Sequence, residues 1–334
     1  MPSKGSANPI GGQSAIIKLK WGSSPEEMKI DGAPKFIKFA LGENVKQTNW
    51  GDFNTVRFPQ TRMGVEQVYY DAFERARKYK EEHDVYNKLG EKAKRKVIKP
   101  AVDFELEVLN EILNSERFIT CHSYIQSEIN MLMKVADSRG FTLNTFTHIL
   151  EGYKVADKMK EHGAGGSTFS DWWAYKYEVN DAIPYNASML NAMGIVTAIN
   201  SDDAEMARRL NQEAGKAVKY GNTSQEDAWK MVTLNPAKLL HLDDRIGSIK
   251  KGKDADIVIW SDNPLSINAK TEKTFVEGVL LFDIEKQDEL IERNRVEKAR
   301  ILTKMKNSKL GTSAKKKEFK KKKKAHYHCD TLGH

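Results

Sequence analysis

Short apolar runs recur along the first part of the chain, with stretches of helical apolar spacing between them. A run of this length, rich in β-branched residues and bounded by turn signals, is typical of a buried strand. Five runs qualify, and Ala164–Trp173 is a sixth candidate; the five are Ser14–Lys20, Lys35–Leu41, Arg117–His122, Phe141–His148 and Gly194–Asn200. Strand followed by helix, repeated, predicts an α/β fold with a parallel sheet or a (β/α) barrel, here with fewer strands than a full barrel.

Helical spacing fills the intervals between these runs. A long charged helical region is expected at about Gly64–Asn114, with a break near Pro100. Further helices are expected after the later strands, at Ser123–Ser138, Glu151–Glu161 and Glu205–Tyr220.

The pattern changes after Leu240. Glycine turns separate short strand-like runs in 243–260 and 271–283, and a charged amphipathic helix follows at 283–307. The sequence therefore predicts four parts: a partial barrel, a β-sandwich portion, a C-terminal helix and a basic, disordered tail, at 1–240, 241–284, 285–309 and 310–334.

The positive charge is concentrated in that tail. Of the net charge of +8, residues 315–324 (KKKEFKKKKK) account for +7, with eight lysines and one glutamate. The other residues are nearly neutral together, so we expect no specific nucleic-acid partner for the folded part. A run of like charges is typically solvated; weak attraction to RNA or anionic lipid is the alternative.

Targeting signals are lacking in the given sequence. It contains no apolar run of 18 residues, so no membrane span is expected. The N-terminal MPSKGSANPIGG lacks the apolar segment of a signal peptide. The two cysteines are too few for a disulfide scaffold. A cytoplasmic location is the default, and export is expected if a longer parent protein carries a signal.

Side chains able to bind a metal stand where three of the predicted strands end. They are His122, His148 and Asp202. The carboxyl ends of parallel barrel strands converge on one edge, so these side chains are expected to meet there. Imidazole with carboxylate favours zinc, iron, manganese or nickel over calcium. Lys38, inside an apolar strand, is a fourth candidate, because a neutral amine can react with carbon dioxide to give a metal-bridging carbamate.

Each of these residues also has a structural alternative. A single histidine at a strand end is more often a hydrogen-bonded structural residue than a ligand. An aspartate at a strand exit is a common helix N-cap, which is the expectation for Asp203 in particular. Lys38 alone could extend to the surface.

Several segments resemble the amidohydrolase superfamily, specifically imidazolonepropionase-like metal-dependent hydrolases. The most specific is Asn235–Trp260, NPAKLLHLDDRIGSIKKGKDADIVIW, which resembles the passage from the last barrel helix into a β-sandwich. Four more segments resemble other parts of that family: Asn8–Leu19, Lys35–Asn44, Cys121–Ile129 and Ile199–Glu205. The resemblance covers about Asn8–Asp283 and implies a (β/α)8 TIM-barrel-like hydrolase with a small C-terminal β portion.

The resemblance also implies roles for individual residues. His122 and His148 would be the metal ligands of the fifth and sixth barrel strands. Asp202 would contact the metal and accept a proton from the attacking water. Lys38 falls on the fourth strand, where many members use a carboxylated lysine. The implied cofactor is one or two divalent ions, zinc above all.

One feature of the family is missing from the sequence. Members have a His-x-His pair at the end of the first barrel strand, whereas the first histidine here is His83 and the H-x-H is His326–His328. This predicts an N-terminally incomplete chain, either a fragment or one polypeptide of a larger assembly; a degenerate site is the alternative. Homo-oligomerisation is a further expectation.

The implied reaction is hydrolysis of an amide or related C–N bond in a small molecule, with Asp202 as general base and then acid. In the segment 167–185, Trp172 and Tyr185 are candidates for the substrate wall, although core packing is the commoner role of such residues. A non-catalytic remnant acting as a structural or binding module is the alternative function. Metal chelation by the terminal AHYHCDTLGH is another.

Overall fold

The computed structural model describes residues 7–46, 58–172 and 174–309, and these form two sheets. The larger sheet has six strands in chain order: β1 (Ile10–Ser14), β2 (Lys35–Ala40), β3 (Arg117–His122), β4 (Thr145–His148), β5 (Gly165–Thr168) and β6 (Thr197–Ile199). The smaller has three strands: β7 (Ile257–Trp260), β8 (Thr271–Val276) and β9 (Val279–Asp283).

Strands β2 to β6 are parallel neighbours, joined by helical crossovers, while β1 pairs antiparallel with β2. The helices before β6 are α1 (Pro25–Met28), α2 (Glu43–Lys46), α3 (Arg62–Lys88), α4 (Glu91–Lys94), α5 (Phe104–Leu113), α6 (Gln126–Arg139), α7 (Ala156–His162) and α8 (Asn186–Ala192), with 3₁₀ turns η2 (Gly152–Lys154) and η3 (Tyr177–Val179). This is an α/β, TIM-barrel-like arrangement with a C-terminal β portion.

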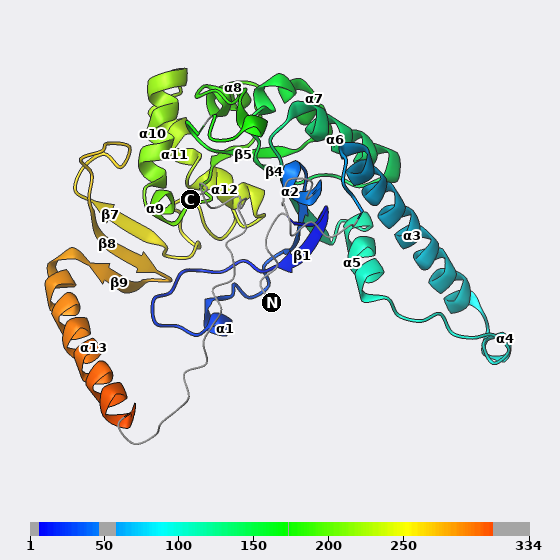
Figure 1. Cartoon of the computed structure of the whole chain (residues 1–334), viewed down its shortest axis with the longest axis horizontal. Helices are drawn as coiled ribbons and strands as arrows, with labels where there is room; N and C mark the ends of the chain where they lie inside the picture. The colour runs from blue at the N-terminus through cyan, green and yellow to red at the C-terminus, as the bar shows by residue number, and fades with distance from the viewer. Residues whose placement is uncertain (1–6, 47–57, 173, 310–334) are drawn as a thin grey trace.

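The remaining helices follow β6. They are α9 (Ala204–Ala207), α10 (Leu210–Gly221), α11 (Gln225–Lys230), α12 (Leu234–Leu239) and, after the turn η4 (Ile284–Lys286), α13 (Gln287–Lys309). The expected break near Pro100 is confirmed: α3, α4 and α5 form an arm that projects from the sheet, with α4 at its tip (Figure 1).

The main core lies between the parallel strands and helices α3, α5 and α6. Strand β2 is buried on both faces, as expected for a parallel strand covered by helices. The ring of Phe39 lies 5.2 Å from that of Tyr69 on α3, and Phe73 stacks on Phe141 at 3.9 Å. The Tyr69 hydroxyl donates to the carbonyl of Ala40 at 2.8 Å, which ties α3 to the end of β2.

The outer edge of β6 is covered by the segment around α11 and α12. The Ile199 amide donates to the Met231 carbonyl at 2.9 Å, and Asn235 Nδ2 donates to the Thr197 carbonyl at 2.8 Å. These bonds satisfy edge groups that would otherwise be open to pairing with another strand.

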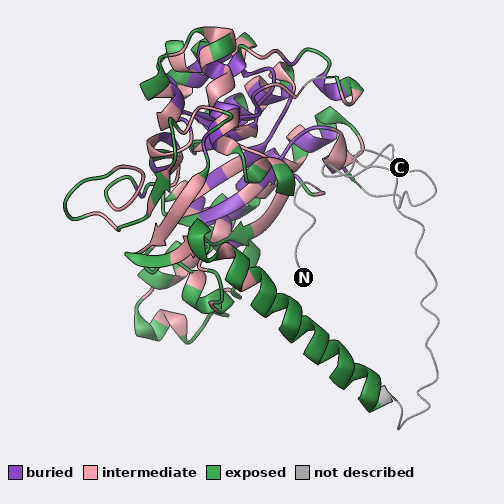
Figure 2. Cartoon of the chain, turned by 90° about the vertical axis from the view of Figure 1, so that its left-hand side faces the viewer, coloured by how far each residue is buried: buried purple, intermediate pink, exposed green. Residues whose placement is uncertain are grey.

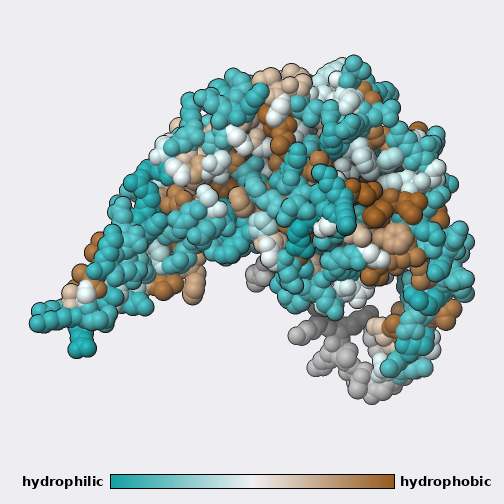
Figure 3. Space-filling view, turned by 180° about the vertical axis from the view of Figure 1, so that it is seen from behind, coloured by the Kyte–Doolittle hydropathy of each residue, from teal (hydrophilic) through white to brown (hydrophobic). Residues whose placement is uncertain are grey.

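The smaller sheet and α13 extend away from the core. Almost all of α13 is exposed (Figure 2). Seen from behind, hydrophobic groups gather on the side that carries β7–β9 (Figure 3). A cavity of about 880 Å³ lies between this sheet and α11–α12, and its lining includes Trp229 and Trp260. None of the strand-end residues His122, His148 and Asp202 lines it.

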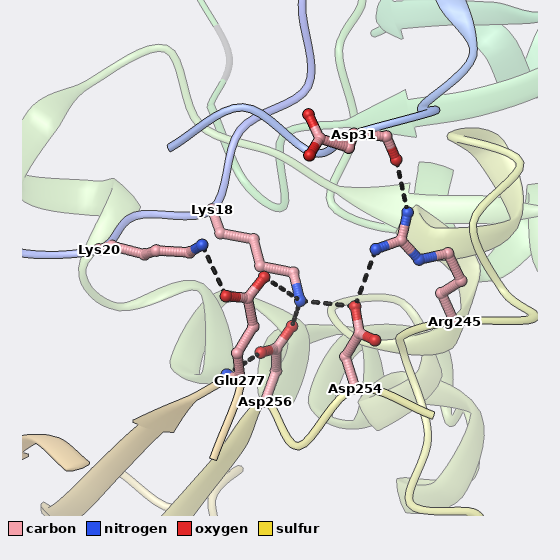
Figure 4. Close-up of polar contacts among 7 residues, drawn as sticks. All are labelled: Lys18, Lys20, Asp31, Arg245, Asp254, Asp256 and Glu277. Atoms are coloured by element: carbon pink, nitrogen blue, oxygen red, sulfur yellow. Dashed lines mark hydrogen bonds and ion pairs between the residues drawn. The ribbon is translucent and has the colours of Figure 1, made fainter. Parts of the chain in front are cut away.

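A group of ion pairs joins the N-terminal segment to the smaller sheet (Figure 4). Lys18 Nζ lies 2.7 Å from Asp254 Oδ2, 3.0 Å from Asp256 Oδ2 and 3.4 Å from Glu277 Oε1. The prediction of a strand at Ser14–Lys20 is therefore wrong: the strand is Ile10–Ser14. Beyond it the chain makes only an isolated bridge, between Ile17 and Lys29. Lys18 is buried among carboxylates, while Leu19 is 80% exposed.

No described helix is long and apolar enough to cross a membrane. The predictions for the lysine tail and for the terminal AHYHCDTLGH lie outside the described residues.

Candidate active site

The two strand-end histidines lie side by side at the carboxyl edge of the larger sheet. His122 is the last residue of β3 and His148 the last of β4. Because β3 and β4 are parallel, with His122 opposite Thr147, both side chains reach the same edge. Their ring centroids are 4.8 Å apart and the ring planes meet at 73°, an edge-to-face arrangement. The sequence prediction that these two residues converge is confirmed.

His122 is a buried side chain whose ring nitrogens find no hydrogen-bond partner in the described part of the chain. Its relative exposure is 1%, and neither Nδ1 nor Nε2 has a partner among the residues that the structure describes. Its ring also meets that of Tyr124 edge to face, at 4.6 Å. Leaving a buried polar atom unsatisfied costs about 1–3 kcal/mol, so two such atoms on one ring call for a partner that the described residues do not supply.

His148, unlike His122, has polar neighbours at both ring nitrogens and aromatic rings stacked on it. Its φ of +69° is unusual for a residue other than glycine, and such backbone strain tends to occur at functional sites. The ring stacks on Phe169 at 4.8 Å and on Tyr124 at 5.9 Å. Its Nδ1 lies 2.9 Å from Asn200 Nδ2, and its Nε2 lies 3.6 Å from Asp202 Oδ2.

Both imidazoles are neutral at pH 7. Burial lowers the pKa of His122 well below its usual value of 6.5; the repulsion that a proton on His148 would bring, and the charges of Lys38 and Lys176, lower it further. Burial likewise lowers the pKa of His148 to about 3, with Lys38 and Lys176 contributing. A neutral ring retains one nitrogen lone pair, which is the form that binds metal.

The two adjacent aspartates have different surroundings. Asp203 is the N-cap of α9, and its carboxylate accepts from the amides of Glu205 and Met206, both at 2.9 Å. Its predicted capping role is confirmed. Asp202 makes no such contact with α9, and it faces Nε2 of His148.

Lys38 lies on β2, half-buried and paired in register with Thr120 of β3. Sequence reasoning missed Lys176, whose Nζ lies 4.3 Å from the ring centroid of Tyr124 and 3.0 Å from Glu178 Oε2. The sequence pattern did not indicate a role for Lys176, because this residue lies in an irregular segment far along the chain from either histidine. Asn200 was also missed, although it stands two residues before Asp202 at the strand exit.

The two wall candidates differ in position. Trp172 packs on Phe169 at 5.0 Å, and Phe169 stacks on His148, so Trp172 lies one ring away from the histidine pair. Tyr185 instead makes a ring contact with Tyr220 on α10, at 6.5 Å, and is about half exposed.

The donor atoms suit a divalent cation, although they do not enclose one. Among the described residues, no three His, Cys, Asp or Glu side chains are grouped closely enough to hold a metal ion. The neutral, adjacent rings of His122 and His148 nevertheless fit as a ligand pair, because His122 has two unsatisfied buried nitrogens and Nε2 of His148 points to a carboxylate.

Comparison with known proteins assigns the chain to a family. The model of the amidohydrolase family matches residues 62–281, which is most of the chain. The chain belongs to the amidohydrolase family. This family is generally metal-dependent, in agreement with the donor set at the strand ends.

Similar proteins come from three organisms. An amidohydrolase from Thermotoga maritima MSB8 superposes with a TM-score of 0.73 and 31% identity, over 84% of this chain and 70% of its own. Amidohydrolase tasK of Hapsidospora irregularis is 28% identical over 84% of this chain. Imidazolonepropionase of Thermoplasma volcanium is 28% identical over 49% of it. The matched parts cover 30% of tasK and 42% of the imidazolonepropionase.

Proposed function

We propose that this amidohydrolase-family chain carries part or all of the site of a metal-dependent hydrolase that cleaves an amide or related C–N bond in a small molecule. The observation that carries the proposal is the pair of buried, neutral imidazoles on adjacent parallel strands, with Asp202 within 3.6 Å of one of them. The names of its relatives, an imidazolonepropionase among them, support a cyclic or linear amide as the bond class.

His122 and His148 would hold the cation, which we propose to be zinc, with iron and manganese as alternatives. Lys38 is proposed as an additional ligand after carboxylation; its place on β2, beside β3, and its effect on both imidazoles support this. A bound cation supplies Lewis-acid polarisation of the scissile carbonyl and acidifies water to a pKa of about 7.

The protein's own residues would move the proton. The Asp202 carboxylate accepts a proton from the attacking water as the water oxygen bonds to the carbonyl carbon. The same carboxyl group then gives that proton to the leaving nitrogen as the C–N bond breaks. Phe169 covers one face of His148, with Trp172 packed against Phe169, and the two rings would limit the access of bulk water there.

Metal content tests the proposal. The full-length chain, with His122→Ala, His148→Ala and the control His83→Ala, is loaded with zinc, dialysed and measured by plasma mass spectrometry. His83 lies on the arm, where its ring packs on Tyr79. The terminal histidines remain in every variant, so differences report on the strand-end pair alone. We expect each site variant, but not His83→Ala, to lose about one zinc equivalent.

An alternative has one observation in its favour: the absence of a closed three-ligand group among the described residues. It makes the chain a structural or binding module without catalysis. Equal metal content in all four proteins would support that alternative. A loss specific to the strand-end variants would remove that observation as an argument for it and justify a screen of amides, cyclic amides and dipeptides.

A further inference from the structure

Asn200 has an unexplained position beside His148. Its backbone amide donates to the Thr168 carbonyl at 3.0 Å, which fixes it at the exit of β6. Its side-chain amide then meets His148 Nδ1 at 2.9 Å, while Asn200 Oδ1 is buried and has no partner among the described residues. No other described side chain makes a hydrogen bond to Nδ1.

This contact decides which nitrogen of His148 is free. The oxygen and nitrogen of an Asn amide exchange places by a half-turn of the side chain, and the partner determines which orientation holds. If the NH₂ group faces Nδ1, the ring proton is on Nε2. If the oxygen faces Nδ1, Nδ1 carries the proton and the Nε2 lone pair points toward Asp202.

The other contacts of the ring leave it little freedom. Phe169 and Tyr124 stack against His148, with interplanar angles of 25° and 26°. The plane of the ring is therefore set by packing, and the position of its proton is left to two polar neighbours, Asn200 at Nδ1 and Asp202 at Nε2. His122 offers the contrast, because both its nitrogens lack a partner within the described part of the chain.

We infer that Asn200 is a positioning residue: its Oδ1 accepts a hydrogen bond from Nδ1–H of His148 and so presents the Nε2 lone pair to a divalent cation. Ligating histidines generally donate their other ring N–H to an oxygen in this way, and loss of such a partner lowers metal affinity by about 10–100-fold. The inference rests on the proposed function for its purpose, but the hydrogen bond itself exists without a metal.

The test measures the tautomer directly in the metal-free, full-length chain. Long-range ¹H–¹⁵N correlation of ¹⁵N-histidine-labelled protein at pH 7 distinguishes Nδ1–H from Nε2–H, and the His148→Ala spectrum assigns the signal. We compare the native protein with Asn200→Asp, which can accept but not donate, and with Asn200→Leu, which does neither. Zinc affinity is measured for the same proteins by competition with a chromophoric chelator.

The expected result is Nδ1–H in the native protein and in Asn200→Asp, with zinc affinities similar to each other. Asn200→Leu should lose the preference for Nδ1–H and bind zinc about 10–100-fold more weakly. Asn186→Leu is the matched control, because Asn186 is a buried amide that bonds to Thr168 and Ile149 but not to His148; it should keep the native tautomer.

An Nε2–H tautomer in the native protein would overturn the inference, as would Asn200→Leu that keeps both native tautomer and native affinity. If Asn200→Leu does not fold, Asn200→Asp decides: a change to Nε2–H there refutes the acceptor role. If only the proposed function is wrong, the tautomers will still follow the prediction, but no variant will change zinc binding.

Discussion

The carboxylate of Asp202 lies 3.6 Å from Nε2 of His148, although the two residues are 54 positions apart in the chain. Strand β6 delivers Asp202 to the edge where β4 ends, with β5 between them. The neighbouring Asp203 points elsewhere and caps α9. Two consecutive carboxylates therefore serve different purposes, one at the candidate site and one in the local fold.

Substitution should separate these two aspartates. Asp202→Asn should weaken zinc binding by about tenfold or more, because an amide carries no charge to attract the cation, and should leave stability nearly unchanged. Asp203→Ala should instead lower the free energy of unfolding by about 0.5–2 kcal/mol through loss of the N-cap. Asp203→Asn, which can still cap, is the control. Chelator competition measures the zinc affinity, and urea unfolding measures the stability. A loss of stability in Asp202→Asn together with a loss of zinc affinity in Asp203→Ala would contradict the assignment.

The ends of the apolar runs were sufficient to locate the histidine pair in the sequence. Strand β3 has the predicted bounds, Arg117–His122, and β4 ends at the predicted His148. A strand buried between helices ends where its side chains become polar, so the end of an apolar run in the sequence marks the last residue of the strand. Parallel pairing then places consecutive strand ends together without further information.

Contacts between distant segments were not accessible in this way. Lys18 is buried because Asp254, 236 residues later, binds it, and the local pattern indicated a strand instead. Asn200 and Tyr124 contact His148 through side chains from different loops. The polarity of such residues shows that they need partners, but only the folded chain shows which ones.

The covering of the β6 edge gives a second prediction. Asn235→Ala removes the donor to the Thr197 carbonyl and should cost about 1–3 kcal/mol of unfolding free energy, because a buried acceptor is left unsatisfied. Amide exchange at Ile199, whose N–H bonds to Met231, should also accelerate. Asn268→Ala, at an exposed position, is the control. Unchanged protection of Ile199 would show that Asn235 does not hold this edge.

The Lys18 group predicts how stability depends on pH (Figure 4). The hydrogen bond from Lys18 holds the pKa of Asp254 below its usual 3.8. Burial alone would lower the pKa of Lys18, but its bonds to Asp254 and Asp256 outweigh burial and raise it above 10.5. The stabilisation from Asp254 is therefore complete above its unfolded pKa and is lost as pH falls through the folded value. That from Lys18 is present below about 10.5 and is lost as pH rises through its folded pKa.

Lys18→Met should accordingly lower the unfolding free energy at pH 7 by about 1.5–3 kcal/mol. It should also flatten the loss of stability below pH 4, because Arg245 alone then holds the pKa of Asp254 below its usual value. Lys29→Met removes an exposed pair with Glu26 and should change little. Urea unfolding between pH 3 and pH 11 measures both the acid and the alkaline loss of stability. If the unfolding free energies of Lys18→Met and the native protein depend on pH in the same way, the role of this group is refuted.

Gly42 and Gly22 allow the last prediction to separate backbone strain from crowding. Both have a φ of +87°. A Cβ at Gly42 would lie 2.4 Å from Glu178 Oε1, whereas a Cβ at Gly22 would meet nothing within 4 Å. The left-handed backbone penalises alanine at either position by about 1–2 kcal/mol. Only Gly42→Ala must also displace Glu178, whose Oε1 accepts from the Glu43 amide at 2.9 Å.

We therefore expect Gly42→Ala to lose about 1–3 kcal/mol more unfolding free energy than Gly22→Ala in guanidinium titrations. Equal losses would mean that Glu178 moves aside freely. The excess matters for the site, because Glu178 pairs with Lys176, and the charge of Lys176 acts on both imidazoles. A displaced Glu178 should release Lys176 from its place over Tyr124, so Gly42→Ala, unlike Gly22→Ala, should also change zinc affinity.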